Sequence, residues 1–204
     1  MLAALGLIFC PSGADALASP TSAHPQAHAT RSHSAHARSR SAGHSECQNA
    51  TAMPSESNLA LIRAATLCLI NRERANHGEP ALRADTQLQS AAQGHTDSMV
   101  KGDYFAHIGP SGDTPLQRMT AADYIYSEHI GYEVGENIAW GTLQLSTPSA
   151  VVAAWMASAG HRANILNARF RDTGIGVAAH VPASLAQGQA GGIYTQDFGV
   201  IVTG

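Results

Sequence analysis

A stretch without large apolar side chains divides this chain of 204 residues and limits where a folded core can begin. Residues 19–46 consist almost wholly of Ser, Ala, His, Arg, Pro and Thr, and they contain no Leu, Ile, Val or aromatic residue. Such a segment cannot bury enough apolar surface to offset the entropy that is lost on ordering. We therefore predict a disordered linker over residues 19–46 and a folded domain over residues 47–204.

The first eighteen residues have the features of a secretory signal peptide. Leu2–Cys10 is an apolar run, shorter than the roughly 20 residues that a membrane-spanning helix needs, and a small-residue cleavage pattern follows at Ala16-Leu17-Ala18. Cys10 follows Phe9 instead of the small residue that precedes a lipid-attachment cysteine, so lipidation is the weaker interpretation. Because no other segment is apolar enough to span a membrane, we expect residues 1–18 to be removed and the protein to be secreted.

Export determines how the cysteines are interpreted. If Cys10 leaves with the signal peptide, Cys47 and Cys68 remain, and an oxidising compartment favours a disulfide between them. Closing a loop of about 20 residues stabilises a fold by roughly 3 kcal/mol in the chain-entropy model. The alternatives are two free thiols or a metal-binding pair, but the domain has no further cysteine to complete a thiolate site. We predict the disulfide.

The periodicity of apolar residues predicts helices first and strands later. The predicted helices begin at capping residues and several end at Gly or Pro; they cover residues 57–77, 85–102, 114–122 and a segment from Thr147 through Trp155. Beyond Asp172 the apolar residues alternate, which predicts two antiparallel strands, near residues 175–179 and 192–202, joined by a loose hairpin. This order indicates an α+β fold with a small antiparallel sheet covered by helices.

Four short polar motifs occur along the predicted domain. They are Tyr104-Phe105-Ala106-His107, Gly135-Glu136-Asn137-Ile138, the run from Trp155 through Gly160-His161-Arg162-Ala163-Asn164-Ile165, and Tyr194-Thr195-Gln196-Asp197-Phe198-Gly199. Histidine and glutamate beside glycine and aromatic residues are expected where polar side chains converge on a pocket. The motifs indicate a site, although they do not name a reaction.

The order of these four motifs resembles that of the CAP superfamily, which includes cysteine-rich secretory proteins, insect venom antigens and plant pathogenesis-related proteins. The resemblance is to its bacterial secreted, SCP-like branch, and it covers about residues 59–204. It implies a three-layer α-β-α sandwich, in agreement with the α+β pattern. It also implies a secreted binding or signalling module, because the superfamily has no common reaction.

The resemblance further implies a central cleft with two histidines and two acids, sometimes around a divalent cation. His107 and Glu136 match the first histidine and the first acid. The second acid would fall near Ser158 and the second histidine near Ile193, so the chain departs from the full set. His161 could reach the same cleft instead. Two imidazoles and a carboxylate are zinc ligands with an open fourth position, so we expect weak Zn²⁺ binding at His107, His161 and Glu136.

Further residues of the motifs are candidates for the cleft, each with a structural alternative. These binding candidates are Asn137, Arg162, Tyr194 and Gln196. Glu136 could instead hold a turn at Gly135, Asn137 could fix a loop, and His161 with Arg162 could cap the helix of Trp155. Tyr194 could line either the core or the cleft. His95 lies on the apolar face of its helix, which is typical of a buried core histidine.

Two functions from different classes follow. The first is a non-catalytic, monomeric module that binds a cell-wall component, lipid or protein through the cleft. The second is a divalent-metal-dependent extracellular hydrolase that uses the same cleft. Ser158 with His161 is the local candidate for a nucleophile and base, but it lacks the strained elbow and oxyanion loop of acyl transfer. Nucleic-acid binding is disfavoured, because the domain is acidic and has no basic patch among aromatic residues.

Overall fold

The computed structural model describes the backbone of residues 5–7 and the whole of residues 46–202. In these residues five strands form one sheet in the order β1-β3-β5-β4-β2. The strands are β1 Leu5–Leu7, β2 Arg83–Ala84, β3 Gly131–Thr142, β4 Asp172–Ala178 and β5 Gly191–Val202. Neighbouring strands are antiparallel except β2 and β4, which are parallel. Apart from Glu46, the predicted linker lies outside the described residues, as does most of the predicted signal peptide.

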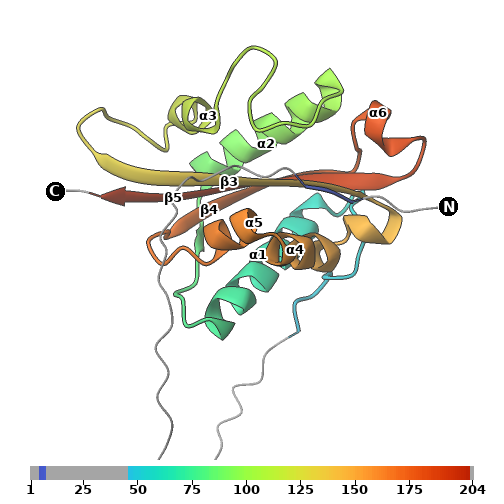
Figure 1. The fold of residues 1–204 in the computed structure, drawn as a ribbon, viewed down its shortest axis with the longest axis horizontal. Coiled ribbons are helices and arrows are strands. Elements are labelled where there is room, and N and C mark those ends of the chain that lie inside the picture. Colours follow the sequence, from blue (N-terminus) through green and yellow to red (C-terminus); the bar gives the residue numbers. More distant parts are fainter. Residues whose placement is uncertain (1–4, 8–45, 203–204) are drawn as a thin grey trace, which may run out of the picture. The chain divides into compact units, whose positions relative to one another are not determined.

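Helices cover both faces of the sheet, as the three-layer prediction requires (Figure 1). One face carries α2 Thr86–Gly102 and α3 Pro115–Ala121, and we call it the α2 face. The other carries α1 Leu59–Asn76, α4 Pro148–Ala157 and α5 Ala159–Ile165, and we call it the α1 face. Two short elements, the 3-10 helix η1 Leu143–Ser146 and α6 Ala183–Ala186, lie between strands in the sequence. The α-β-α sandwich is confirmed.

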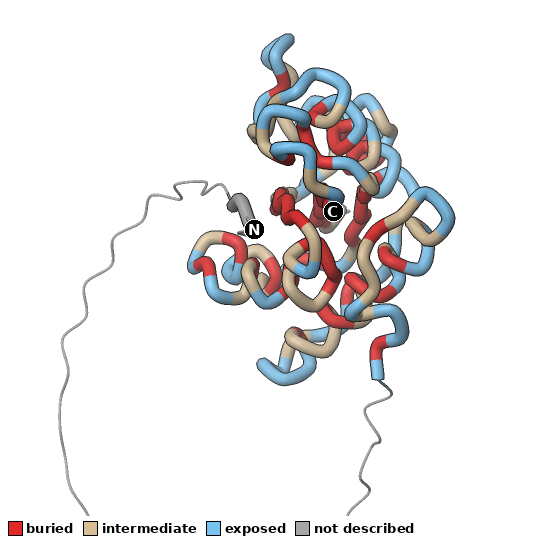
Figure 2. The backbone as a smooth tube through the Cα atoms, turned by 90° about the vertical axis from the view of Figure 1, so that its right-hand side faces the viewer, coloured by how far each residue is buried: buried red, intermediate tan, exposed pale blue. Residues whose placement is uncertain are grey.

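Strand alternation sends neighbouring residues of β3 and β5 to opposite faces of the sheet. Glu136 pairs with Asp197, and the next residue of β3, Asn137, pairs with Gln196. On the α2 face the core contains Met99 of α2 together with residues of β3 and β5. On the α1 face Trp155 packs among a larger cluster of buried residues. Figure 2 shows buried backbone running through the interior, with exposed segments around it.

Most helix boundaries follow the predicted capping residues. Asp85 accepts a hydrogen bond from the backbone of Leu88 at the start of α2, at 2.9 Å. Thr114 forms a capping box at the start of α3, and Thr147 caps α4. Each side chain satisfies backbone N–H groups that have no partner within the helix. The first helix, in contrast, begins after Asn58, one residue later than a cap at Ser57 would set it.

The strand β3 was not predicted, and this is the main correction to the fold. Its sequence contains Gly, Glu and Asn, which are poor strand formers. Pairing along the whole length of β5 nevertheless places Gly131–Thr142 in the middle of the sheet. Gly135 therefore lies in a strand opposite Phe198 and forms no turn, so the structural role considered for Glu136, holding a turn there, is wrong.

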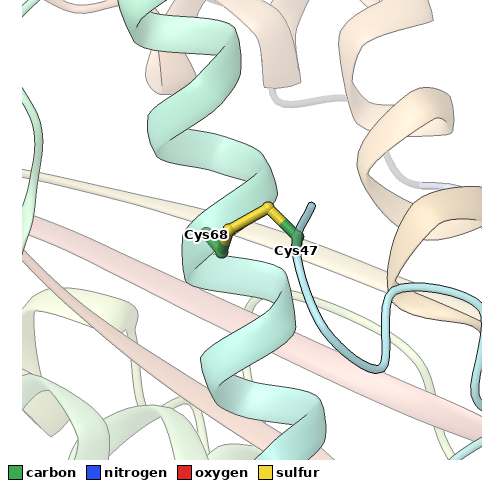
Figure 3. Close-up of a disulfide and its surroundings, with 2 residues drawn as sticks. All are labelled: Cys47 and Cys68. Carbon is green, nitrogen blue, oxygen red and sulfur yellow. A yellow bond between two sulfur atoms is a disulfide. The ribbon is translucent and has the colours of Figure 1, made fainter. Parts of the chain in front are cut away.

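The predicted disulfide is confirmed. Cys47 and Cys68 are bonded, with 5.7 Å between their Cα atoms, and Cys68 lies in the middle of α1 (Figure 3). The bond ties the segment that leads into α1 to the helix itself. No helix within the described residues is both long and apolar enough to cross a membrane.

Candidate functional site

His107 and Glu136 meet on the α2 face of the sheet. His107 lies in the loop between α2 and α3, and its Nδ1 is 2.7 Å from Oε1 of Glu136 on β3. The side chains are 11% and 2% exposed, respectively. A hydrogen bond to a carboxylate fixes the orientation of an imidazole ring and, in its neutral form, places the proton on Nδ1.

Arg118 of α3 holds the other oxygen of the same carboxylate. Its Nη2 donates to Oε2 of Glu136 at 2.7 Å and to the backbone carbonyl of His107 at 2.9 Å. Its Nη1 donates to the backbone and side chain of Asp113, in the loop that carries His107. Burial alone would raise the pKa of Glu136, but the hydrogen bond from His107 and the charge of Arg118 outweigh it and lower that pKa. Glu136 is therefore ionised and its two oxygens are engaged.

His95 of α2 contacts the backbone of the loop that carries His107. It is fully buried, and its Nε2 lies 2.9 Å from the carbonyl oxygen of Ala106, the residue before His107. Burial lowers the pKa of His95, an effect that the Glu136 charge opposes and the Arg118 charge reinforces. A neutral His95 with its proton on Nε2 donates to Ala106. His95 is thus a core histidine, as its helical position suggested, and it also positions the loop at His107.

The second ring nitrogen of His107 has unused hydrogen-bonding capacity. Nε2 is buried and has no hydrogen-bond partner among the described residues. In the neutral ring whose Nδ1 proton is donated to Glu136, Nε2 carries a lone pair. A buried polar atom without a partner is costly unless something pairs with it. The arrangement can therefore accept a hydrogen bond from a hydroxyl or amide group.

Asp197 adds a second carboxyl group to this cluster. It lies directly across from Glu136 on β5 and is fully buried. Burial, and then the neighbouring charge of Glu136, raise the pKa of Asp197 well above its ordinary value. Asp197 is therefore protonated beside an ionised Glu136. Asp197 and Arg118 were not predicted as site residues. Asp197 lies two residues after Thr195 in a predicted strand and therefore on the same face of it, whereas no motif marks Arg118.

His161 lies on the opposite face of the sheet, so the expected cluster of His107, Glu136 and His161 is not assembled. His161 belongs to α5 on the α1 face, where its Nδ1 is 2.7 Å from the hydroxyl of Ser158. Its backbone carbonyl accepts a hydrogen bond from Asn137, which points to the same face. Asn137 points toward α5, and neighbouring residues of a strand point to opposite faces of the sheet. Glu136 therefore points away from His161.

The zinc set expected from the sequence does not fit this geometry. Both oxygens of Glu136 are occupied by His107 and Arg118, and the sheet separates His161 from them. Across residues 46–202 no group of three His, Cys, Asp or Glu side chains is arranged to hold a metal ion.

The remaining predicted cleft residues also lie on the α1 face and make structural contacts. Asn137 accepts a hydrogen bond from Asn164 at 2.9 Å. Tyr194 is buried against Trp155 and donates to a backbone carbonyl of η1, and Gln196 donates to Thr173 of β4. Arg162, an exposed residue of α5, donates to a backbone carbonyl of α4. Of the seven predicted binding residues, only His107 and Glu136 lie in the charged cluster on the α2 face.

Comparison with known proteins agrees with the four motifs and the layered fold. The family model of the cysteine-rich secretory protein (CAP) family matches residues 67–198, which is most of the described domain. The chain belongs to this family. An uncharacterised Bacillus subtilis protein, YkwD, is 35% identical over 130 residues, which are 64% of this chain and 44% of that protein. This family member thus spans less than half the length of that relative.

Solved structures show the same fold. An extracellular protein from Bacillus anthracis that contains an SCP domain superposes with a TM-score of 0.55 at 29% identity, over 71% of this family member and 43% of that chain. An outer surface protein of Borrelia burgdorferi superposes with a TM-score of 0.54 over 72% of this chain and 95% of that one. At 18% identity, the second likeness concerns the fold alone.

Proposed function

We propose that this CAP domain is an extracellular binding module that anchors its ligand at His107. The ligand contributes a hydroxyl or amide N–H to the buried Nε2 of His107. Glu136 and Arg118 keep the ring in place from behind. The single observation that carries the proposal is the buried, unpartnered Nε2 of an imidazole whose Nδ1 is already held by a buried carboxylate.

The chemistry of this acceptor favours ligands rich in hydrogen-bond donors over the apolar tail of a lipid. A cell-wall component or a protein presents many hydroxyl and amide donors, whereas a lipid tail presents none. Extracellular action is part of the proposal; a structural relative of Bacillus anthracis is described as extracellular, which supports it.

No observation in the described chain favours the metal-dependent hydrolase. That alternative depended on His161 as the second imidazole, and His161 lies across the sheet. Ser158 and His161 do contact each other, but both are buried between α4, α5 and the sheet, 7% and 3% exposed. We therefore propose binding without chemistry at the His107 site.

Co-sedimentation with isolated bacterial cell-wall sacculi tests the proposal, with phosphatidylcholine vesicles, whose headgroup has no hydrogen-bond donor, as the comparison. We expect the protein to bind sacculi, and the substitution His107→Ala to weaken this binding about tenfold, the effect of a hydrogen bond worth roughly 1.4 kcal/mol. Glu136→Gln should also weaken it, because an amide no longer fixes the Nδ1 tautomer. His129→Ala, at an exposed loop residue, is the matched control and should bind as the natural chain does.

The same samples distinguish binding from hydrolysis. Mass spectrometry of the supernatant, with EDTA and again with added zinc, should detect no soluble wall fragments. Equal binding by the natural chain and His107→Ala would overturn the His107 anchor. Zinc-dependent release of fragments that His107→Ala abolishes would replace the binding module with the hydrolase.

A further inference from the structure

At one position on the outer edge of β4, a side chain forms the backbone hydrogen bonds that a neighbouring strand would form. Gln93 of α2 donates from Nε2 to the carbonyl of Val177 at 3.1 Å and accepts from the N–H of Val177 at 3.0 Å. These are the two hydrogen bonds that a neighbouring strand would make with Val177. The backbone of Val177 therefore faces away from β5, and by alternation so do those of Thr173 and Ile175.

The short strand β2 closes the same edge at the other end, and its ladder stops before Ile175. Asp85 donates its backbone N–H to the carbonyl of Thr173 at 2.9 Å. The next bond would join the N–H of Ile175 to the carbonyl of Asp85, but that carbonyl accepts from Gln89 at 3.0 Å, in the first turn of α2. The start of α2 thus removes the chain from the edge. Within the described residues, the outward N–H and C=O of Ile175 have no partner.

A pocket opens at this gap. It has a volume of about 330 Å³ and lies between α1 and α2, with β4 behind it. Its walls are mostly small or apolar, and its polar side chains are those of Arg63, Gln89 and Thr173; the other lining residues are Ala60, Ala64, Leu67, Ala84 and Ile175. The volume is at the lower end of the range for ligand sites, which begins at about 300 Å³.

We propose that this pocket is a docking site for an extended peptide that adds to the edge of β4 at Ile175 and ends in a carboxylate. Two backbone hydrogen bonds to Ile175 would continue the pattern that Gln93 makes with Val177. Main-chain pairing with an open sheet edge is a general mode of peptide recognition, with pockets that select the side chains. This site is independent of the His107 site.

The charges at the pocket specify the carboxylate. Arg63 is the only ionisable side chain among the lining residues, and its Nη1 lies 3.3 Å from Oε1 of Gln93, next to the edge. The carboxylate of Asp85 already caps the first turn of α2, so the positive charge available to a ligand at this wall is that of Arg63. A small apolar residue followed by a C-terminal carboxylate matches Ala60 and Ala64 on one side and Arg63 on the other.

Amide NMR of the full chain tests the proposal, with the N-acetylated tetrapeptide Thr-Val-Thr-Val and its free C-terminal carboxylate as the probe. We expect the Ile175 amide signal to shift and its exchange with deuterium to slow at least tenfold at saturation. The Val177 amide should change little, because Gln93 already bonds it. A peptide that is N-methylated at its central residues cannot pair with the edge and should leave Ile175 unchanged.

Matched variants separate the pocket from general binding. Arg63→Gln should weaken peptide binding about tenfold, while Arg72→Gln on the same helix should not. Ala64→Trp fills the pocket and should abolish binding, while Ala75→Trp, at an exposed position of α1, should not. An Ile175 amide that is unmoved by the peptide, equal binding of the N-methylated peptide, or a concentration-dependent dimer that protects Ile175 without peptide would each overturn the proposal.

Discussion

At the residue scale, two neighbouring carboxyl groups hold opposite protonation states because their surroundings differ. Glu136 has His107 and Arg118 as partners, whereas Asp197, directly opposite on β5, has neither. Two buried carboxyl groups on paired residues of neighbouring strands repel each other when both are ionised, so one of them keeps its proton. The charge therefore stays on Glu136, where it orients His107, and the proton stays on Asp197.

The substitution Asp197→Asn tests this assignment. A raised pKa in the folded state means that Asp197 contributes stability below its unfolded pKa of about 4, and that this contribution is lost as the pH rises. Asparagine stays neutral at every pH. We expect the free energy of unfolding of the variant, relative to the natural chain, to rise between pH 4 and pH 7, by at most about 1.4 kcal/mol per pH unit.

Urea denaturation at a series of pH values measures this difference. Groups that do not interact with Asp197 are common to both proteins and cancel in this difference, whereas Glu136 and Asp197 contribute to it as an interacting pair. Parallel stability curves for the two proteins would show that Asp197 is ionised in the fold.

How far the site could be predicted depends on what each residue signals locally. His107 and Glu136 occur in motifs of the family, so the sequence found both. His161 follows Ser158 by three residues, and proximity in sequence does not tell which face of a sheet a helix covers. His161 was misplaced because β3 was not predicted. In a strand, Glu136 and Asn137 point to opposite faces of the sheet, so a helix that contacts Asn137 cannot also contact the side chain of Glu136. Arg118 acts through tertiary contacts, for which one sequence carries no pattern.

At the element scale, the contact between α2 and β4 depends on glycine. A Cβ atom at Gly174 or Gly176 would collide with the backbone of α2, at Leu88 and Gln89 or at Ala92 and Gln93. Two small residues therefore let the helix lie directly on the strand. This close approach also brings Gln93 within reach of Val177.

A pair of alanine substitutions tests the role of this contact. Gly176→Ala should destabilise the fold by about 1–3 kcal/mol, because the helix must move to admit the methyl group. Gly94→Ala, in α2 with no atom near its added Cβ, should stabilise it by up to about 1 kcal/mol through helix propensity. Thermal denaturation of both variants measures the contrast; equal effects would mean that α2 does not pack on β4 as described.

The strand-like role of Gln93 gives a second prediction for these elements. Gln93→Ala would leave the N–H and C=O of Val177 unpaired at the sheet edge, at a cost of about 1–3 kcal/mol. A longer open edge also promotes pairing between molecules. We expect lower stability in urea and faster growth of light scattering on mild heating. Gln89→Ala, an exposed residue one turn earlier, should change stability by less than about 0.5 kcal/mol.

At the scale of the domain, the sheet separates two layers with different tasks. The α2 face carries the charged cluster around Glu136, while the α1 face carries the larger apolar core and the disulfide. Capping residues and apolar periodicity predicted most of the helices and the hairpin of β4 and β5. They did not predict β3, because its central position comes from pairing with β5 and not from its own composition.

The disulfide should therefore affect the stability of the domain without affecting the His107 site. Cys47 and Cys68 close a loop with a sequence separation of 21, and removing such a cross-link costs about 3 kcal/mol. For a domain of this size that corresponds to a melting temperature lower by roughly 6–12 °C. The double variant Cys47→Ala, Cys68→Ala should melt that much earlier in a calorimeter. Below its melting temperature it should bind sacculi as tightly as the natural chain, because the cross-link lies on the opposite side of the sheet from His107. An unchanged melting temperature would show that the loop is held by packing alone, and a loss of binding in the folded variant would show that the two layers are coupled.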